Sequence, residues 1–310
     1  MSQIAQRDYF GKALKDLAKR EDIVVLDADL AGSTKTSEFK KVCPERFVEI
    51  GIAEQNMIGI SSGLAAEGKT VFATTFGVFA TGRCWEQVRL CVAYPELNVK
   101  IVATHCGISV GEDGATHQAL EDISLMRTMP NMTVISPADA YETYAATIAI
   151  ADHYGPVYMR MGRSPVPTVS EEGEKFIIGK AKALREGKDV TLFGTGQMVF
   201  NCIEAAEELK KEGVSAEVVN VSTIKPLDRD TVLASVSKTG CAVTAEEHSI
   251  IGGLGSAISE LLSEELPSPV FRIGTGDIFG ESGSPAELFV KYKLTSGDIA
   301  KAARKAMKKR

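Results

Sequence analysis

Short runs of β-branched and other apolar residues alternate along the chain with longer segments whose apolar positions recur with helical spacing. The clearest helical segment in the first half is 52–67, and further helices are expected to begin near Phe79 and to cover 117–128 and the residues up to 150. The apolar runs between them lie at 22–29, 69–75, 98–104, 132–137 and 156–161. This alternation predicts an α/β fold in which helices pack on a mostly parallel sheet.

The stretch at 166–179 interrupts the pattern. It combines proline, acidic residues and glycine, a composition that ends regular structure and is typical of a linker. Beyond it the alternation resumes in a smaller unit, with apolar runs at 189–196, 216–222 and 242–248. We therefore expect two domains, at 1–165 and 180–310, joined by this linker.

Composition narrows the classes of function. The 310 residues carry a formal charge of -6, so there is no diffuse basic surface to favour nucleic acid. No apolar run reaches the length that spans a membrane. Six cysteines are scattered without a CxxC pair, and the start of the chain lacks the apolar stretch of a signal peptide. We expect a cytoplasmic protein with reduced thiols and with neither a nucleic-acid nor a membrane partner.

Glu54 lies in the segment GIAEQNM, where a helix is expected to begin. Backbone amides exposed at a helix start favour an anion, while the apolar neighbours Ile52 and Met57 favour burial. A carboxyl group in such a balance can share a proton with a ring nitrogen. The alternative is that Glu54 only complements the helix dipole.

Phe76, Phe79 and Arg83 follow one another at i, i+3 and i+7 in TTFGVFATGR. A helix over these residues would present them on one face. Aromatic rings on such a face could sandwich a flat heterocycle. The alternative is ordinary core packing.

Two of the chain's four histidines, His105 and His117, bracket a loop in the segment 104–118 that contains three glycines. Glycines allow the backbone to approach a ligand closely. Imidazoles can move protons or hydrogen-bond sugar oxygens, and Asp113 could fix the position of a hydroxyl. A metal site formed with Cys106 is an alternative, although no second ligand pair has the usual zinc spacing.

Together these segments resemble the transketolase family, in order and along essentially the whole chain. The match runs from Arg7 through DADLAGS, GIAEQNM, TTFGVF, VATHCGISVGEDGATHQ and YMRMGRSP, and GEDGATHQ is its most discriminating part. The resemblance implies that 1–165 is a pyrimidine-binding domain for thiamine diphosphate and that 180–310 is a transketolase C-terminal domain.

The resemblance also implies residue roles at the cofactor. Glu54 would contact the ring nitrogen of the aminopyrimidine, and Phe76 and Phe79 would line that ring. Asp29, in DADL, matches a family acid near the subunit interface and the thiazolium, so a supporting role is expected for it.

On the substrate side, His105 and His117 would bind the reacting oxygens and relay protons. Asp113 would recognise the hydroxyl beside the carbonyl of the donor. The family's anion-binding positions, which would hold the sugar phosphate, match Arg7, Ser33 and Arg160.

Two departures from the family shape the functional hypothesis. Gly82 stands where many full-length transketolases have a third aromatic residue, and the GDG motif that holds the diphosphate through a divalent metal is absent. The resemblance therefore indicates the C-terminal subunit of a two-gene transketolase. Such an enzyme transfers a two-carbon ketol unit between sugar phosphates. Its N-terminal partner subunit would supply most of the residues that bind the diphosphate of thiamine diphosphate and Mg²⁺. The two subunits would form an α2β2 assembly.

Three alternatives stay open. The chain could be the β subunit of a 2-oxo acid dehydrogenase, against which GEDGATHQ and Arg160 argue. It could belong to a 1-deoxyxylulose 5-phosphate synthase, although that family is normally one longer polypeptide. A non-catalytic scaffold subunit is the third, and the presence of Glu54, His105 and His117 argues against it.

Overall fold

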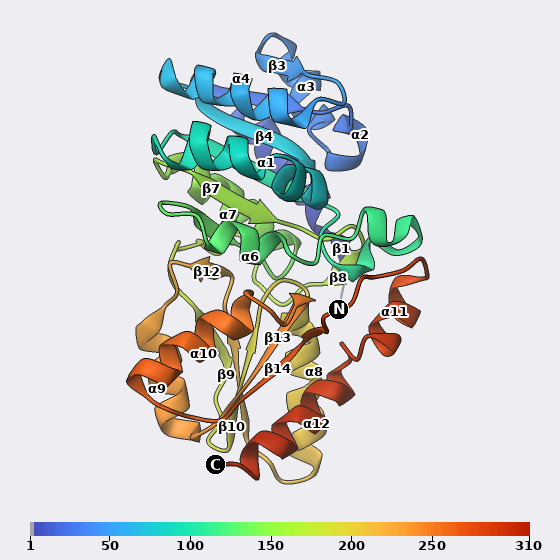
Figure 1. The fold of residues 1–310 in the computed structure, drawn as a ribbon, viewed down its shortest axis with the longest axis vertical. Helices are drawn as coiled ribbons and strands as arrows, with labels where there is room; N and C mark the ends of the chain where they lie inside the picture. Colours follow the sequence, from blue (N-terminus) through green and yellow to red (C-terminus); the bar gives the residue numbers. More distant parts are fainter. Residues whose placement is uncertain (1–2) are drawn as a thin grey trace.

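The computed structural model describes residues 3–310, which form two α/β units stacked along the long axis of the molecule (Figure 1). The described residues form a seven-stranded sheet in the first unit and a five-stranded sheet in the second. A short antiparallel ladder pairs β1 (Gln3–Ala5) with β8 (Pro165–Pro167). This ladder ties the beginning of the chain to the residues that leave the first unit.

The first sheet has the strand order β12-β6-β7-β5-β4-β2-β3 and is parallel except for β12. Its strands are β2 (Ile23–Asp27), β3 (Phe47–Glu49), β4 (Thr70–Phe76), β5 (Val99–Thr104), β6 (Thr133–Ile135), β7 (Val157–Arg160) and β12 (Thr223–Lys225). All residues of the central strands β2, β4, β5 and β7 are buried. Continuous burial follows because helices cover both faces of the sheet.

One face of this sheet packs against α4 (Glu54–Ala66), the π-helical turns η2 (Phe79–Arg83) and η3 (Val88–Ala93), and α6 (Asp122–Arg127). The other face packs against α1 (Gln6–Leu17), α3 (Ser37–Val42) and α7 (Ala140–Asp152). The remaining short elements of this unit are α2 (Ala31–Thr34), η1 (Pro44–Arg46), α5 (Trp85–Gln87) and the 3-10 segment η4 (Ile108–Thr116).

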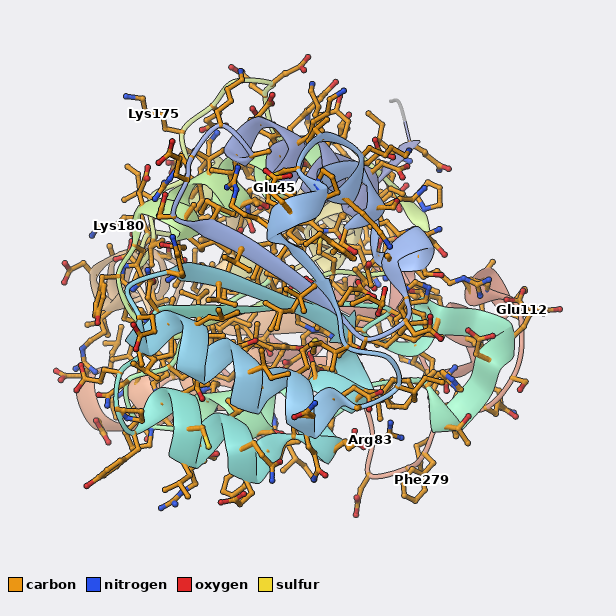
Figure 2. All side chains as sticks on the ribbon, turned by 90° about the horizontal axis from the view of Figure 1, so that it is seen from above. Glu45, Arg83, Glu112, Lys175, Lys180 and Phe279 are labelled. Atoms are coloured by element: carbon orange, nitrogen blue, oxygen red, sulfur yellow. The ribbon has the colours of Figure 1, made fainter. Side chains whose placement is uncertain are left out.

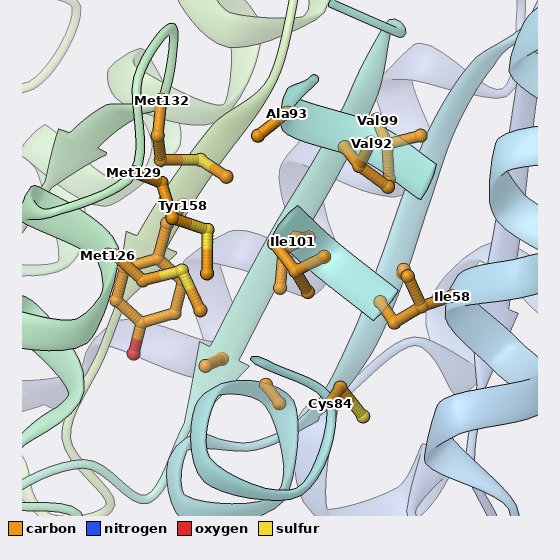
Figure 3. Packing of buried hydrophobic residues seen from close by; sticks show 14 of the residues in the cluster. Ile58, Cys84, Val92, Ala93, Val99, Ile101, Met126, Met129, Met132 and Tyr158 are labelled. Atoms are coloured by element: carbon orange, nitrogen blue, oxygen red, sulfur yellow. The ribbon is translucent and has the colours of Figure 1, made fainter. Parts of the chain in front are cut away.

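The core on the α4 face is centred on β5. Figure 3 shows Ile101 of β5 between Ile58 of α4 and Met126 of α6. Tyr158 of β7 is fully buried in the same cluster. Because such interiors are close-packed, they hold the carboxyl ends of the strands in fixed positions.

The second sheet has the order β14-β13-β10-β11-β9, and only β9 runs antiparallel. Its strands are β9 (Lys182–Arg185), β10 (Val190–Gly194), β11 (Ala216–Asn220), β13 (Ala242–Ser249) and β14 (Val270–Thr275). The helices are α8 (Met198–Lys211) and α12 (Ser296–Met307) on one face, α9 (Arg229–Thr239) and α10 (Leu254–Glu265) on the other, and α11 (Pro285–Lys291), which lies beside η4 of the first unit (Figure 1).

The predicted α/β class and its two mostly parallel sheets are confirmed. β12 departs from the predicted arrangement, since it follows the linker in sequence yet pairs with β6 of the first sheet. The helix expected over 117–128 begins only at Asp122, after an irregular segment. None of the helices between residues 3 and 310 has the length and apolar character needed to cross a bilayer.

Candidate active site

The carboxyl ends of neighbouring strands bring three predicted site residues, together with one arginine that the sequence analysis did not assign, to one edge of the first sheet. In the order β7-β5-β4-β2, these ends carry Arg163, His105, Phe76 and Asp29. Side chains that end adjacent parallel strands meet in this way, which is why ligands of open α/β sheets bind there. Glu54 joins the group from the first position of α4, which packs beside β4.

Glu54 is buried beneath Arg83. The Nη1 atom of Arg83 donates to both carboxylate oxygens of Glu54, at 2.9 and 2.8 Å. The Glu54 side chain is 3% exposed and that of Arg83 is 46% exposed. The guanidinium carbon of Arg83 also lies 4.5 Å from the ring centroid of Phe79. Sequence reasoning missed the ion pair between Glu54 and Arg83, because the i+4 spacing of Phe79 and Arg83 indicates only that these two side chains meet.

The two phenylalanines and the two histidines form one cluster. Phe76 stacks on His105 with ring centroids 3.8 Å apart and on Phe79 at 6.2 Å. His117 presents an edge-on ring to Phe76 at 6.4 Å and to Phe79 at 5.4 Å. Phe76 ends β4 rather than lying on a helix, so the prediction of a single helical face was wrong in its geometry. The same residues nevertheless come together with Arg83.

His105 is held as a neutral imidazole. The residue is 3% exposed and has a left-handed backbone, with φ 57°. Burial lowers the pKa of His105 from 6.5 to about 3, and the nearby Arg7, Arg163 and His117 act in the same direction. The Nδ1 atom lies 2.9 Å from the hydroxyl of Thr104. His105 therefore lies close to two arginines, Arg7 and Arg163. As a neutral imidazole it can still hydrogen-bond a substrate oxygen.

The glycines of the loop between His105 and His117, here called the histidine loop, lie against other parts of the protein. Gly107, Gly111 and Gly114 all have positive φ, as the sequence suggests. A Cβ at Gly107 would overlap the carboxyl group of Glu247, and a Cβ at Gly114 would overlap Ser282. The expectation that these glycines allow a ligand to approach is therefore not supported, because the second unit fills that space.

Arg7, Ser33 and Asp29 lie around the start of the chain and the loop after β2. Arg7 donates to the carbonyl oxygen of Ser33 at 2.9 Å, and its Nε atom is buried without a hydrogen-bond partner. The loop is shaped by buried Asp27, which accepts hydrogen bonds from the Leu30 amide and from two threonine hydroxyls. Asp29 is exposed at φ 63°, and its amide donates to Glu49 at 2.8 Å. Arg7 thus has hydrogen-bonding capacity free for an anion.

Arg160 does not belong to this surface, so the predicted phosphate contact is corrected. Its side chain is 5% exposed and pairs with fully buried Asp122 through Nε at 2.7 Å. Asp122 also accepts a hydrogen bond from Tyr158 at 2.6 Å. A buried guanidinium that is already paired cannot reach a sugar phosphate.

Arg163, three residues further on, is the more exposed of the two arginines and lies beside the loop that contains η4. It is 38% exposed and lies 3.2 Å from Glu112 and 3.9 Å from Asp113, the carboxylate predicted to recognise the donor hydroxyl. Figure 2 shows Glu112 at the edge of the molecule, on the loop that contains η4. Both arginines lie in the segment YMRMGRSP. They differ because Arg160 belongs to buried β7, whereas Arg163 follows the end of that strand.

The alternative metal site of the sequence analysis is not formed. Among residues 3–310, no group of three or more His, Cys, Asp or Glu side chains is arranged to hold a metal ion. Cys106 is 1% exposed, and burial raises the pKa of its thiol to about 12. A thiol that stays protonated is a poor metal ligand.

Comparisons with known proteins decide the family. The description "Transketolase, pyrimidine binding domain" matches residues 2–168, and "Transketolase, C-terminal domain" matches residues 179–299. The chain belongs to the transketolase family. It is the C-terminal section of a split transketolase, with pyrimidine-binding and C-terminal domains.

Three relatives cover almost the whole chain. A putative transketolase C-terminal section of Methanocaldococcus jannaschii is 50% identical over 98% of this chain and 96% of its own length. A 6-deoxy-6-sulfo-D-fructose transketolase subunit of a Clostridium species is 47% identical over 96% of this chain and 92% of its own. A solved structure described as a split gene transketolase in an inactive β4 tetramer is 51% identical, with a TM-score of 0.93 over 99% of this chain and 100% of that one.

Proposed function

We propose that this chain is the catalytic C-terminal subunit of an enzyme that transfers a two-carbon ketol unit from a ketose phosphate to an aldose phosphate. It would act with an N-terminal subunit, thiamine diphosphate and Mg²⁺. One observation carries the proposal: at the carboxyl edge of the sheet, the buried carboxylate of Glu54 is linked through Arg83 to a pair of phenylalanines that contact two imidazoles.

The residues present fit an aminopyrimidine. Arg83 places a planar, nitrogen-bearing group over Phe79 and donates hydrogen bonds to Glu54. An aminopyrimidine is also planar and also offers nitrogen to a carboxylate. The space that the Arg83 guanidinium fills therefore offers a flat aromatic wall and a carboxylate acceptor, as the cofactor ring requires. For the ring to bind there, the Arg83 side chain would have to move towards solvent.

Thiamine diphosphate, when bound, supplies the nucleophilic carbon and the electron sink for breaking the bond beside the ketose carbonyl. Glu54 would hold a proton at the ring nitrogen, which sets the protonation state that activates the cofactor. His105 and His117 would hydrogen-bond the reacting oxygens, with His105 neutral because of its burial. Asp113 would bind the hydroxyl next to the donor carbonyl.

The anionic end of the sugar would lie by Arg7, Ser33 and Arg163. Arg163 replaces Arg160 in this role, because it is partly exposed and its charge acts on His105. Guanidinium groups suit phosphate oxygens, which accept two parallel hydrogen bonds. One relative is named for a sulfonated fructose, which also carries a tetrahedral anion. For this chain we propose a phosphate, because Arg7 and Ser33 match the family's phosphate-binding positions and Arg163 adds a second guanidinium.

The site requires a second polypeptide. No GDG motif for a metal-bound diphosphate occurs in the 310 residues, and without a metal the diphosphate charge lacks its main compensation. We assign the Mg²⁺ and diphosphate grip to the N-terminal subunit, with Asp29 near the junction and an α2β2 assembly. The six cysteines are unpaired, in keeping with a reducing, cytoplasmic location.

Activity of the reconstituted complex tests this proposal. The chain and its N-terminal partner would be mixed with thiamine diphosphate, Mg²⁺, a ketose phosphate donor and an aldose phosphate acceptor. Glu54→Ala is expected to lower kcat by about a hundredfold or more, because the activating proton contact is lost. Glu67→Ala, an exposed change at the other end of α4, is the matched control and is expected to leave kcat unchanged.

The alternatives give different outcomes in the same assay. Turnover of a 2-oxo acid in place of the sugar donor would indicate a 2-oxo acid dehydrogenase subunit. Condensation of pyruvate with an aldose phosphate would indicate a 1-deoxyxylulose 5-phosphate synthase. Full ketol transfer by the Glu54→Ala complex would indicate a scaffold role for this chain.

A further inference from the structure

The second unit grips the histidine loop at two places. Near η4, Gln118 donates to the carbonyl oxygen of Glu281 at 2.9 Å, and Gly114 lies against Ser282. At the start of the loop, Gly107 lies against the side chain of Glu247 from β13. Figure 1 shows α11 and the preceding loop running beside the segment that contains η4.

Glu247 is the only acidic side chain of the second unit within hydrogen-bonding distance of the loop amides among the described contacts. Its Oε1 atom accepts a hydrogen bond from the amide of Ser109 at 2.5 Å, and its Oε2 atom accepts one from Gln197. Gln197 also donates to the hydroxyl of Ser109 at 3.0 Å. The carboxylate is 4% exposed, and Arg160 donates to the backbone carbonyl of the same residue at 3.2 Å. Both carboxylate oxygens of Glu247 are therefore satisfied by groups that fix the loop.

The grip lies two to four residues after His105 in the chain. The amide of Cys106 donates to Met161 at 3.0 Å and the amide of Gly107 donates to Ala119 at 2.9 Å, so the loop is pinned from the first unit as well. Immediately before these points, His105 has a left-handed backbone, which persists only when its surroundings hold it. Loss of the Glu247 contact would release the side of the loop that the first unit does not hold.

We infer that Glu247 is a positioning residue for ketol transfer, which holds the Gly107–Ser109 segment and thereby the imidazole of His105. This role rests on the proposed function. Glu247 is buried against the loop backbone, so its effect on the reaction would pass through the loop. The C-terminal domain is thus part of the active-site framework.

The test uses the full subunit, first alone and then with its partner. In the isolated chain, Glu247→Ala is expected to increase amide hydrogen exchange across 105–117, because the acceptor for Ser109 is gone. In the reconstituted complex the same change is expected to lower kcat by about tenfold or more, with the KM for the sugar donor changed little. Glu247→Gln keeps an acceptor of the same shape, so its amide exchange and its kcat are expected to be close to those of the wild type.

Glu246 offers a matched control on the same strand. Its carboxylate is fully buried and accepts from two backbone amides, Leu254 at 2.7 Å and Gly255 at 2.8 Å, within the second unit. Glu246→Ala therefore removes an equally buried carboxylate but is expected to loosen the start of α10 and to leave both 105–117 and kcat unchanged. If Glu247→Ala cannot be folded, Gln197→Ala is expected to give the same two changes to a smaller degree.

The inference is overturned if Glu247→Ala, or Gln197→Ala in its place, matches Glu246→Ala in the exchange of 105–117 and in kcat. Failure of the proposed function looks different. A wild-type complex without ketol transfer would refute the function, while the exchange experiment on the isolated chain would still report whether Glu247 holds the loop.

Discussion

Arg83 donates through a single nitrogen to both carboxylate oxygens of Glu54, and its guanidinium fills the place that we propose for an aminopyrimidine. Glu54 is buried while Arg83 is half exposed, so the arginine can leave without disturbing the core. The pair compensates a buried charge in the isolated subunit. It also competes with the proposed cofactor for the same carboxylate.

Removing Arg83 is expected to have opposite effects on stability and on cofactor binding. Arg83→Met leaves Glu54 buried and unpaired, so the free energy of unfolding of the isolated subunit should fall by about 1–2 kcal/mol. In the assembled complex the cofactor no longer displaces an arginine, so its Kd should fall severalfold. Urea unfolding and calorimetry check the two parts, with Arg89→Met, an exposed arginine six residues on, as the control. Weaker cofactor binding by Arg83→Met would show that Arg83 supports the ring instead.

Substitutions of Arg163 and Arg160 should have different effects, the first on phosphate recognition and the second on stability. Arg163→Gln removes a partly exposed guanidinium, so the KM for a phosphorylated sugar should rise by about tenfold or more while kcat changes little. Arg160→Met breaks a buried pair with Asp122 and should lower the free energy of unfolding by about 3–5 kcal/mol. Steady-state kinetics and urea unfolding measure these effects. An unchanged KM for Arg163→Gln, together with a selective rise for an Arg160 variant, would restore the original assignment.

His105 should make the fold sensitive to acid. The pKa of His105 is about 3 in the folded chain and near 6.5 in the unfolded chain, so below pH 6.5 the unfolded chain takes up a proton that the folded chain does not. The contribution of neutral His105 to stability is therefore complete above pH 6.5 and is lost as the pH falls towards 3. Between about pH 6.5 and about pH 4.5 the loss is about 2 kcal/mol.

Two measurements check the His105 prediction. In a nuclear magnetic resonance titration, the His105 ring should stay neutral down to about pH 4. His105→Gln should lose that part of the acid dependence seen in urea unfolding. A His105 resonance that titrates near 6.5 would contradict the burial argument.

Much of the fold could be predicted because its signals are local. The apolar run at 98–104 corresponds to β5 at Val99–Thr104, and the helical segment 52–67 corresponds to α4 at Glu54–Ala66. The position of Glu54 at a helix start follows from the same kind of pattern. Each of these depends on neighbours within a few residues.

The rest depends on contacts between distant parts of the chain. β12 has three residues, too few for a periodic signal, and is fixed by pairing with β6. Arg160 differs from Arg163 through Asp122, 38 residues away in sequence. The loop glycines indicate a close approach, but only the structure shows that Glu247 and Ser282 make it. Sequence spacing carries no information about such partners.

The central claim, a coenzyme site shared between two polypeptides, is tested most directly by calorimetry of thiamine diphosphate and Mg²⁺. The titration would be run against this chain alone, against the N-terminal subunit alone and against their mixture. We expect tight binding, with one coenzyme per pair of chains, only in the mixture. Tight binding by the isolated chain would contradict the account.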